Sequence, residues 1–128
     1  MLSKYIKIFL ISFLLMVSID LIYLTINKKL YSSIITVTRL QFAPIAWAFM
    51  AFSLTYFILS DDTLAESQKI FRAMILGLSI YGIYNFTNLT ILQPYNLNIT
   101  ITDTIWGTFL YGFITFIVLL LNNTYKLY

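Results

Sequence analysis

Residues 8–26 read IFLISFLLMVSIDLIYLTI, an apolar run that carries a single charged side chain, Asp20. A helix rises ~1.5 Å per residue, so about 20 such residues cross a hydrocarbon core of about 30 Å. The interior of a bilayer holds no water to bond the backbone, and a helix satisfies its own N–H and C=O groups. The run therefore predicts a membrane-spanning helix over about residues 6–27.

Three further stretches are apolar over a similar length and end at turn signals. We expect three more helices at about 42–60, 66–92 and 103–122. Pro44 falls near the start of the second helix, where a missing N–H is tolerated, and Pro94 follows the third. Residues 1–128 are thus predicted to be all-α and to form one domain, an integral membrane four-helix bundle.

The composition also indicates a membrane protein. Hydrophobic residues make up 60% of the chain and charged residues 10%, whereas soluble domains carry about 25% charged residues. The chain has no cysteine and no histidine, which excludes disulfides, thiolate metal sites and imidazole acid–base chemistry. We therefore expect no metal and no cofactor, and the lipid bilayer as a partner.

The basic residues lie near the ends of the apolar stretches, and the net charge of +3 is small. This pattern is typical of membrane topology, so nucleic-acid binding is not expected. The end that holds both termini carries Lys4, Lys7, Lys69, Arg72 and Lys126, and the opposite end, called the far end, carries Lys28, Lys29 and Arg39. The bias predicts a multi-pass protein with both termini in the cytoplasm. Lys69 and Arg72 are expected to extend to lipid headgroups.

Polar side chains gather in the half of the bundle next to the far end. Asp20 precedes Ile26 by six residues, which places it about 9 Å inside the boundary. Asn85 and Asn88 stand near the far end of the third helix, and Asp103 lies in the first turn of the fourth. A charge near the bilayer centre costs at least ~3 kcal/mol, so these groups are expected to face inward and meet one another.

These polar residues and the aromatic residues beside them form the candidate ligand-binding set. On each helix they recur at steps of three or four, so they share one face. The set is Asp20, Tyr23, Tyr81, Tyr84, Asn85, Asn88, Asp103 and Trp106. The four glycines, Gly77, Gly82, Gly107 and Gly112, are interpreted as positions of close helix contact.

Each polar residue also has a purely structural interpretation. Asp20 could bond to a neighbouring helix to fix packing, and the two asparagines could join helices at ~0.6 to 2 kcal/mol each. Asp103 could complement the positive end of the fourth helix, a role worth roughly 0.3 to 1 kcal/mol. Trp47 and Trp106 suit a membrane-interface belt as well as the wall of a site.

Three motifs carry a family resemblance: DLIYL at 20–24, YGIYNFTNLTIL at 81–92 and DTIWGT at 103–108. In order and spacing they resemble the domain of unknown function 2177 family, small predicted membrane proteins found mainly in bacteria. That family shows an Asp-Leu-Ile-Trp-Leu-like element in its first helix and Tyr-Gly-x-Tyr-Asp-x-Thr-Asn-Leu in its third. Its fourth helix opens with Asp-x-x-Trp-Gly-Thr. The resemblance implies four spans and a membrane location, and it supplies no activity.

Matched position by position, the resemblance selects Asp20, Tyr81, Gly82, Tyr84, Thr87, Asn88, Asp103, Trp106 and Gly107. This chain departs from the family at two positions. Tyr23 stands where the family usually has tryptophan, and Asn85 stands where it usually has aspartate. The chain therefore lacks one of three expected acids, and if the family's chemistry needs that carboxylate, this member binds without catalysing.

The favoured hypothesis is a polar pocket near the far end that binds or translocates a small molecule or a lipid headgroup. Asp20 and Asp103 would supply acceptor or proton-exchanging groups, and the amides and aromatic rings would orient and enclose the ligand. One alternative is a structural or accessory membrane subunit whose polar cluster is interhelical packing. A second is a lipid-phase enzyme using carboxylate acid–base chemistry, which the absence of His and Cys makes the less favoured. A homo-oligomer fits each of the three, because a bundle of this size has a thin interior.

Overall fold

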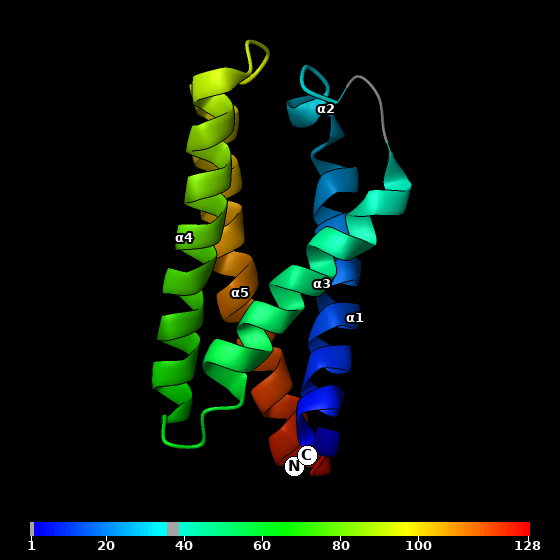
Figure 1. Cartoon of the computed structure of the whole chain (residues 1–128), viewed down its shortest axis with the longest axis vertical. Helices are drawn as coiled ribbons and strands as arrows, with labels where there is room; N and C mark the ends of the chain where they lie inside the picture. The colour runs from blue at the N-terminus through cyan, green and yellow to red at the C-terminus, as the bar shows by residue number, and fades with distance from the viewer. Residues whose placement is uncertain (1, 36–38) are drawn as a thin grey trace.

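The computed structural model describes residues 2–35 and 39–128, which form helices and the turns that join them (Figure 1). The long segments are α1 (Leu2–Ile26), α3 (Ala43–Leu54) continued by η2 (Thr55–Leu59), α4 (Glu66–Ile91) and α5 (Leu97–Tyr125). Two short elements, α2 (Lys28–Tyr31) and η1 (Leu40–Phe42), lie between α1 and α3.

Four stretches are long and apolar enough to cross a membrane. They are Leu2–Ile26, Leu40–Leu59, Glu66–Ile91 and Leu97–Tyr125. Across the described ranges the secondary structure is helical and contains no strand, so the prediction of an all-α, integral membrane four-helix bundle is confirmed. Both termini lie at the same end of the bundle (Figure 1).

The fourth long helix begins earlier than predicted. The sequence predicts a start near residue 103, but α5 begins at Leu97. Asn96 caps it, because its side-chain oxygen accepts a hydrogen bond of 3.0 Å from the Ile99 N–H, and asparagine is among the preferred N-cap residues. Asp103 therefore lies inside the helix, beyond its first turn.

The contact between α4 and α5 depends on three glycines. A Cβ atom at Gly77 would lie 2.4 Å from the Gly107 carbonyl oxygen, and one at Gly112 would lie 2.5 Å from Met74 Cγ. A Cβ atom at Gly107 would lie 2.0 Å from Cγ of the Tyr81 ring. These positions confirm close helix contact, as small residues permit in membrane proteins. Gly82 differs, because a Cβ atom there would meet only the Thr104 methyl at 3.9 Å.

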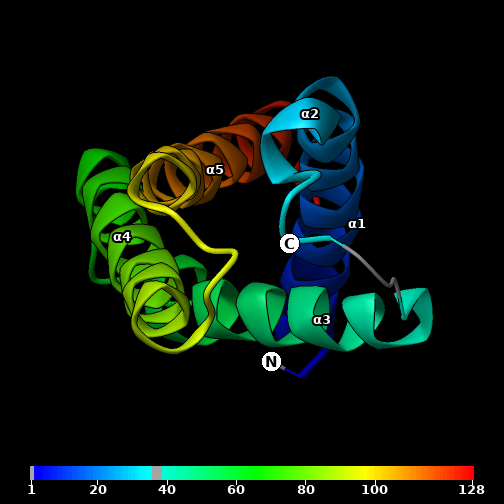
Figure 2. The same ribbon diagram turned by 90° about the horizontal axis from the view of Figure 1, so that it is seen from above.

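The second span, formed by α3 and η2, crosses the bundle obliquely. The end of α3 that continues into η2 approaches the lower part of α4, while its beginning lies far from α4 (Figures 1 and 2). Seen from the far end, α1, α3, α4 and α5 are arranged around the centre of the bundle (Figure 2). The helices α3 and α4 thus diverge toward the far end, which is where the polar residues of the sequence gather.

The apolar core occupies the part of the bundle nearer the termini and its middle. On α1 the buried residues recur at every fourth position, as Ile8, Ser12, Met16 and Asp20. Their aliphatic partners across the bundle include Leu54 and Leu59 on the α3–η2 segment and Ile114 and Val118 on α5. The buried stripe of α1 therefore changes from apolar to acidic as it approaches the far end.

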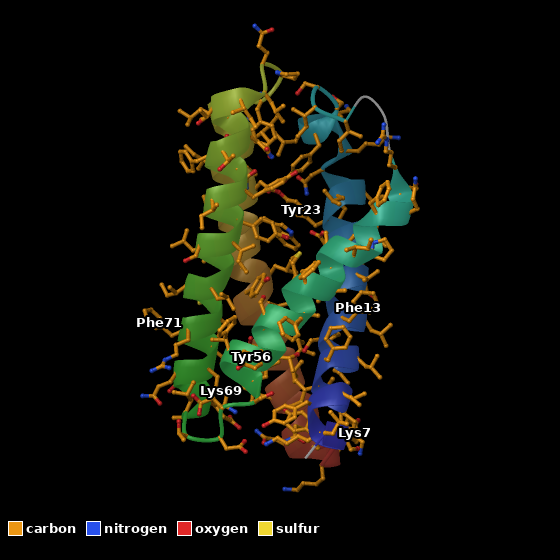
Figure 3. All side chains as sticks on the ribbon, in the orientation of Figure 1. Lys7, Phe13, Tyr23, Tyr56, Lys69 and Phe71 are labelled. Carbon is orange, nitrogen blue, oxygen red and sulfur yellow. The ribbon has the colours of Figure 1, made fainter. Side chains whose placement is uncertain are left out.

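At the end of the bundle that holds the termini, the position of Lys69 differs from the prediction. The sequence predicts that it extends to headgroups, but it is buried, and its amino group donates a 3.1 Å hydrogen bond to the Leu59 carbonyl. Carbonyls in the last turn of a helix lack partners within that helix, and η2 ends at Leu59. The amino group of Lys69, at the lower end of α4 (Figure 3), supplies the missing donor.

Candidate functional site

Asp20 joins three helices. It is 8% exposed, and its two carboxyl oxygens each accept a hydrogen bond from an indole N–H. Trp47 on α3 donates over 2.9 Å and Trp106 on α5 over 2.8 Å. An indole N–H is a donor only, so both bonds require acceptor oxygens on Asp20. The two tryptophans thus serve as donors to a buried acid.

Asp103 forms a second junction of the same kind. It is also 8% exposed, and it accepts from the Tyr31 hydroxyl at 2.7 Å and from the Asn85 amide at 2.8 Å. These donors come from α2 and α4, so the carboxyl of α5 contacts two other elements. Its bonds bridge separate elements, and α5 has no acidic residue in its first turn. Asp103 therefore does not stand in the first turn, where it would complement the positive end of the helix.

Asn85 is fully buried, and both ends of its amide are bonded. The NH₂ group donates to Asp103 and, at 3.4 Å, to the Thr104 hydroxyl. The side-chain oxygen accepts a 2.5 Å hydrogen bond from the Tyr95 hydroxyl in the turn between α4 and α5. An aspartate at this position would have no NH₂ group to donate to Asp103. The amide therefore suits a position beside another carboxyl group.

Tyr23 connects the two acidic junctions. Its hydroxyl lies 2.9 Å from the Tyr31 hydroxyl, which donates to Asp103. Its ring stacks on Trp106, with centroids 3.9 Å apart and planes 5° apart, and Trp106 donates to Asp20. Figure 3 shows Tyr23 on the inner side of α1, in the half of the bundle next to the far end.

Both carboxyl groups line one cavity of about 510 Å³. Its polar lining consists of Asp20, Asp103, Ser53, Tyr31, Tyr81, Tyr84 and Tyr95. Its apolar lining consists of Leu24, Ile34, Ile35, Ala46, Phe49, Met50 and Ile80. This volume falls within the usual range of small-molecule sites, about 300 to 1,000 Å³. The cavity lies between α3 and α4, where the two helices diverge.

The structure divides the predicted site residues into three groups. Asp20, Tyr81, Tyr84 and Asp103 line the cavity. Tyr23, Asn85 and Trp106 stand behind that lining and bond or stack with the residues in it. Asn88 is half-buried and is not among the lining residues. It lies one turn beyond Asn85 on α4, rotated by about 60° from it.

Three aromatic residues that bond to the acids or to Asn85 are absent from the predicted set: Tyr31, Trp47 and Tyr95. Tyr95 follows Pro94 in the turn, where the polar composition suggested only a connection. Both tyrosines lie outside the spans, and burial raises the pKa of Tyr95 to about 12. Burial, together with the hydrogen bonds to Tyr23 and Asp103, also raises the pKa of Tyr31 well above its ordinary value. Both hydroxyls therefore remain protonated donors at neutral pH.

Comparison with known proteins gives a family. No curated protein and no solved structure matches the chain. The family model described as predicted membrane protein (DUF2177) matches residues 5–120. That range covers most of the chain, including all the motifs of α1, α4 and α5 described above. The chain therefore belongs to the DUF2177 family of predicted membrane proteins.

Proposed function

We propose that this protein binds a small molecule or lipid headgroup that presents a positively charged or hydrogen-bond-donating group to Asp20 and Asp103. The observation that carries the proposal is that both carboxyl groups and four tyrosines line one cavity. A role in packing alone accounts for the hydrogen bonds but does not require this open volume beside them.

The two acids have acceptor capacity to spare. A carboxylate offers about four lone-pair sites over its two oxygens. Asp20 and Asp103 each accept two hydrogen bonds from the described side chains, one on each oxygen. About half of the acceptor sites therefore remain for a ligand, and the bonded donors hold the carboxyl groups in fixed positions.

The charge of the cavity selects the kind of ligand. No lysine or arginine is among the described residues that line it, so a phosphate or carboxylate ligand would face two acids without a basic partner. A cation gains instead from both acids and from the faces of the aromatic rings. A contact of this second kind contributes about 0.5 to 2 kcal/mol. The chemistry of the lining therefore favours an organic amine or quaternary ammonium group.

The experiment uses the protein in lipid nanodiscs and tetramethylammonium as the probe. We expect saturable binding to the wild type that disappears in Asp20→Asn/Asp103→Asn. Asp62→Asn, which removes an exposed carboxylate, should bind like the wild type. Acetate, of similar size and opposite charge, should not bind. Equal binding of tetramethylammonium to the wild type and the double variant would remove the two acids from the site.

A second candidate function is structural, and a specific observation favours it. All four carboxyl oxygens of Asp20 and Asp103 already accept hydrogen bonds from other helices or from α2. Under this function the double variant should lose thermal stability while none of the probes shifts the melting temperature of the wild type. A probe-dependent shift that requires the acids would exclude a purely structural role.

A further inference from the structure

The cavity lined by Asp20 and Asp103 has an open side. The position of this opening indicates where the ligand comes from. Ile35, which follows α2, is 49% exposed, and two other large side chains of the lining are more exposed: Phe49 on α3 at 71% and Tyr84 on α4 at 59%. Phe49 and Tyr84 stand on the two helices that diverge toward the far end (Figures 1 and 2). The opening between α3 and α4 therefore leads to the outer face of the bundle.

This opening lies at the depth of the hydrocarbon. Phe49 is nine residues from the Leu40 end of its span, and Tyr84 is seven residues from the Ile91 end of its own. At ~1.5 Å per residue these positions lie about 14 Å and 10 Å along their helices from the ends of the spans. The outer face of a four-helix membrane protein at such a depth is in contact with acyl chains. A ligand that passes between α3 and α4 thus comes from the lipid phase.

The lining changes in character from the opening to the interior. Ala46 and Phe49 are exposed and apolar, whereas the two acids and Tyr31 are buried. A molecule that matches this gradient carries a cationic head and an apolar chain. The two acids and the absence of a basic residue from the described lining disfavour an ordinary anionic phospholipid.

We propose that the ligand is a single-chain lipophilic amine that enters sideways from the membrane between α3 and α4. Its head would lie between Asp20 and Asp103, and its chain would leave between Phe49 and Tyr84 toward the acyl chains. This inference rests on the proposed function for the head and adds the chain and the route. Its failure is distinguishable from a failure of the proposed function.

The first test compares two probes with the same head, tetramethylammonium and decyltrimethylammonium, on nanodiscs with protein. Partition into the lipid is subtracted with nanodiscs that carry Asp20→Asn/Asp103→Asn. We expect the decyl compound to bind roughly tenfold more tightly, because several methylene groups become buried between the helices. Equal affinity of the two probes would overturn the lipophilic ligand and leave the proposed function intact. If neither probe binds better to the wild type than to the double variant, both proposals fail.

The second test locates the chain. The protein has no cysteine, so single-cysteine variants can be labelled at one site. Phe49→Cys and Tyr84→Cys, each carrying a nitroxide label, should lose label mobility when decyltrimethylammonium is added. Ile83→Cys is the matched control, because Ile83 neighbours Tyr84 on α4, is 71% exposed and does not line the cavity.

Immobilisation at positions 49 and 84 without a change at position 83 would support the lateral route. The same response at all three positions, or at none, would overturn it. Ala46→Cys, at an exposed lining position on α3, replaces Phe49→Cys if that variant does not fold.

Discussion

The two sides of α4 differ in how closely they meet the rest of the bundle. On one side α4 touches α5 so tightly that Gly107 leaves no room for a methyl group beside Tyr81. On the other side α4 diverges from α3 around a cavity of about 510 Å³. Tyr81 belongs to both sides, because its ring covers Gly107 and also lines the cavity.

The difference indicates which wall of the cavity is rigid. Close contact over glycines lets two helices pack as one unit, so α4 and α5 form a fixed wall. The hydrogen bonds between α3 and this pair near the cavity are longer than the 2.8 Å bond from Asn85 to Asp103 within the pair. The hydroxyls of Ser53 and Tyr111, for example, are 3.3 Å apart. A change in cavity size is therefore expected to come from movement of α3.

The largest expected effect comes from breaking the tight side. In Gly107→Ala the new Cβ atom would lie 2.0 Å from Cγ of the Tyr81 ring, so the whole ring would have to turn away or the two helices would have to separate. We expect a loss of about 3 kcal/mol or more in the free energy of unfolding, at the upper end for overpacking. Unfolding by SDS in bicelles measures it.

Gly82→Ala is the matched control on the same pair of helices. Its Cβ atom would meet the Thr104 methyl at an ordinary 3.9 Å, and alanine is the better helix former. The stability should be unchanged or slightly higher. Equal losses in the two variants would show that the α4–α5 contact is not as close as described.

A smaller effect is expected from removing the acid that ties α3 to the rigid pair. Asp20→Ala leaves the indole N–H groups of Trp47 and Trp106 without their acceptor. We expect a loss of about 2 kcal/mol, since unpaired buried donors cost about 1 to 3 kcal/mol. The fluorescence of the two tryptophans should also change, because both indoles lose the same partner. A stable Asp20→Ala with unchanged fluorescence would contradict the junction.

Tyr95→Phe tests the turn that closes the rigid pair. The substitution removes the hydroxyl that donates to the fully buried Asn85 oxygen. We expect a loss of about 1 kcal/mol, because one neutral hydrogen bond is deleted. Tyr84→Phe removes an exposed hydroxyl from the same wall of the cavity and should cost less. The pair is measured by SDS unfolding, and a larger cost at Tyr84 would argue against the Asn85 contact.

The smallest effect concerns the end near the termini, where Lys4 on α1 forms an exposed 2.7 Å ion pair with Asp62. The hydrogen bond and the charge of Lys4 hold the pKa of Asp62 below its ordinary value. A lowered folded-state pKa stabilises the fold above the unfolded value of about 3.9, and this contribution disappears as pH falls through the folded-state pKa. The melting temperature of the wild type should therefore exceed that of Asp62→Asn slightly at pH 7. The difference should vanish in acid, and a gap that widens as pH falls would contradict the pairing.

The fold was predictable because long apolar runs have few alternatives in a membrane. The stripe of α1 was also predictable, since Ser12, Met16 and Asp20 recur at every fourth residue and are buried together. The start of α5 was not, because residues 97–102 are polar enough to look like a turn. Their helical state depends on the side chain of Asn96 as a cap, and an asparagine before a polar run is a weak signal.

The site was predictable only in part. Depth along each helix brought Asp20, Asn85 and Asp103 to one level, and hydrogen bonds and the shared cavity connect them with the aromatic residues. The pairing of each acid with its donors was not predictable, because Tyr31 reaches Asp103 only through the short helix α2. The cavity itself depends on the oblique path of α3, and the periodicity of a helix does not encode its tilt.

The two halves of the bundle are consecutive in the chain, and this order matters during biosynthesis. A ribosome completes α1 and α3 before it begins α5, so Asp20 is made long before Trp106 and Asp103. Before α5 is inserted, Asp20 can accept the hydrogen bond from Trp47, which belongs to the same hairpin, but not the one from Trp106. The second hairpin therefore completes the shielding of a charge that the first has already carried into the membrane. A delay between the two insertions would expose that charge to lipid.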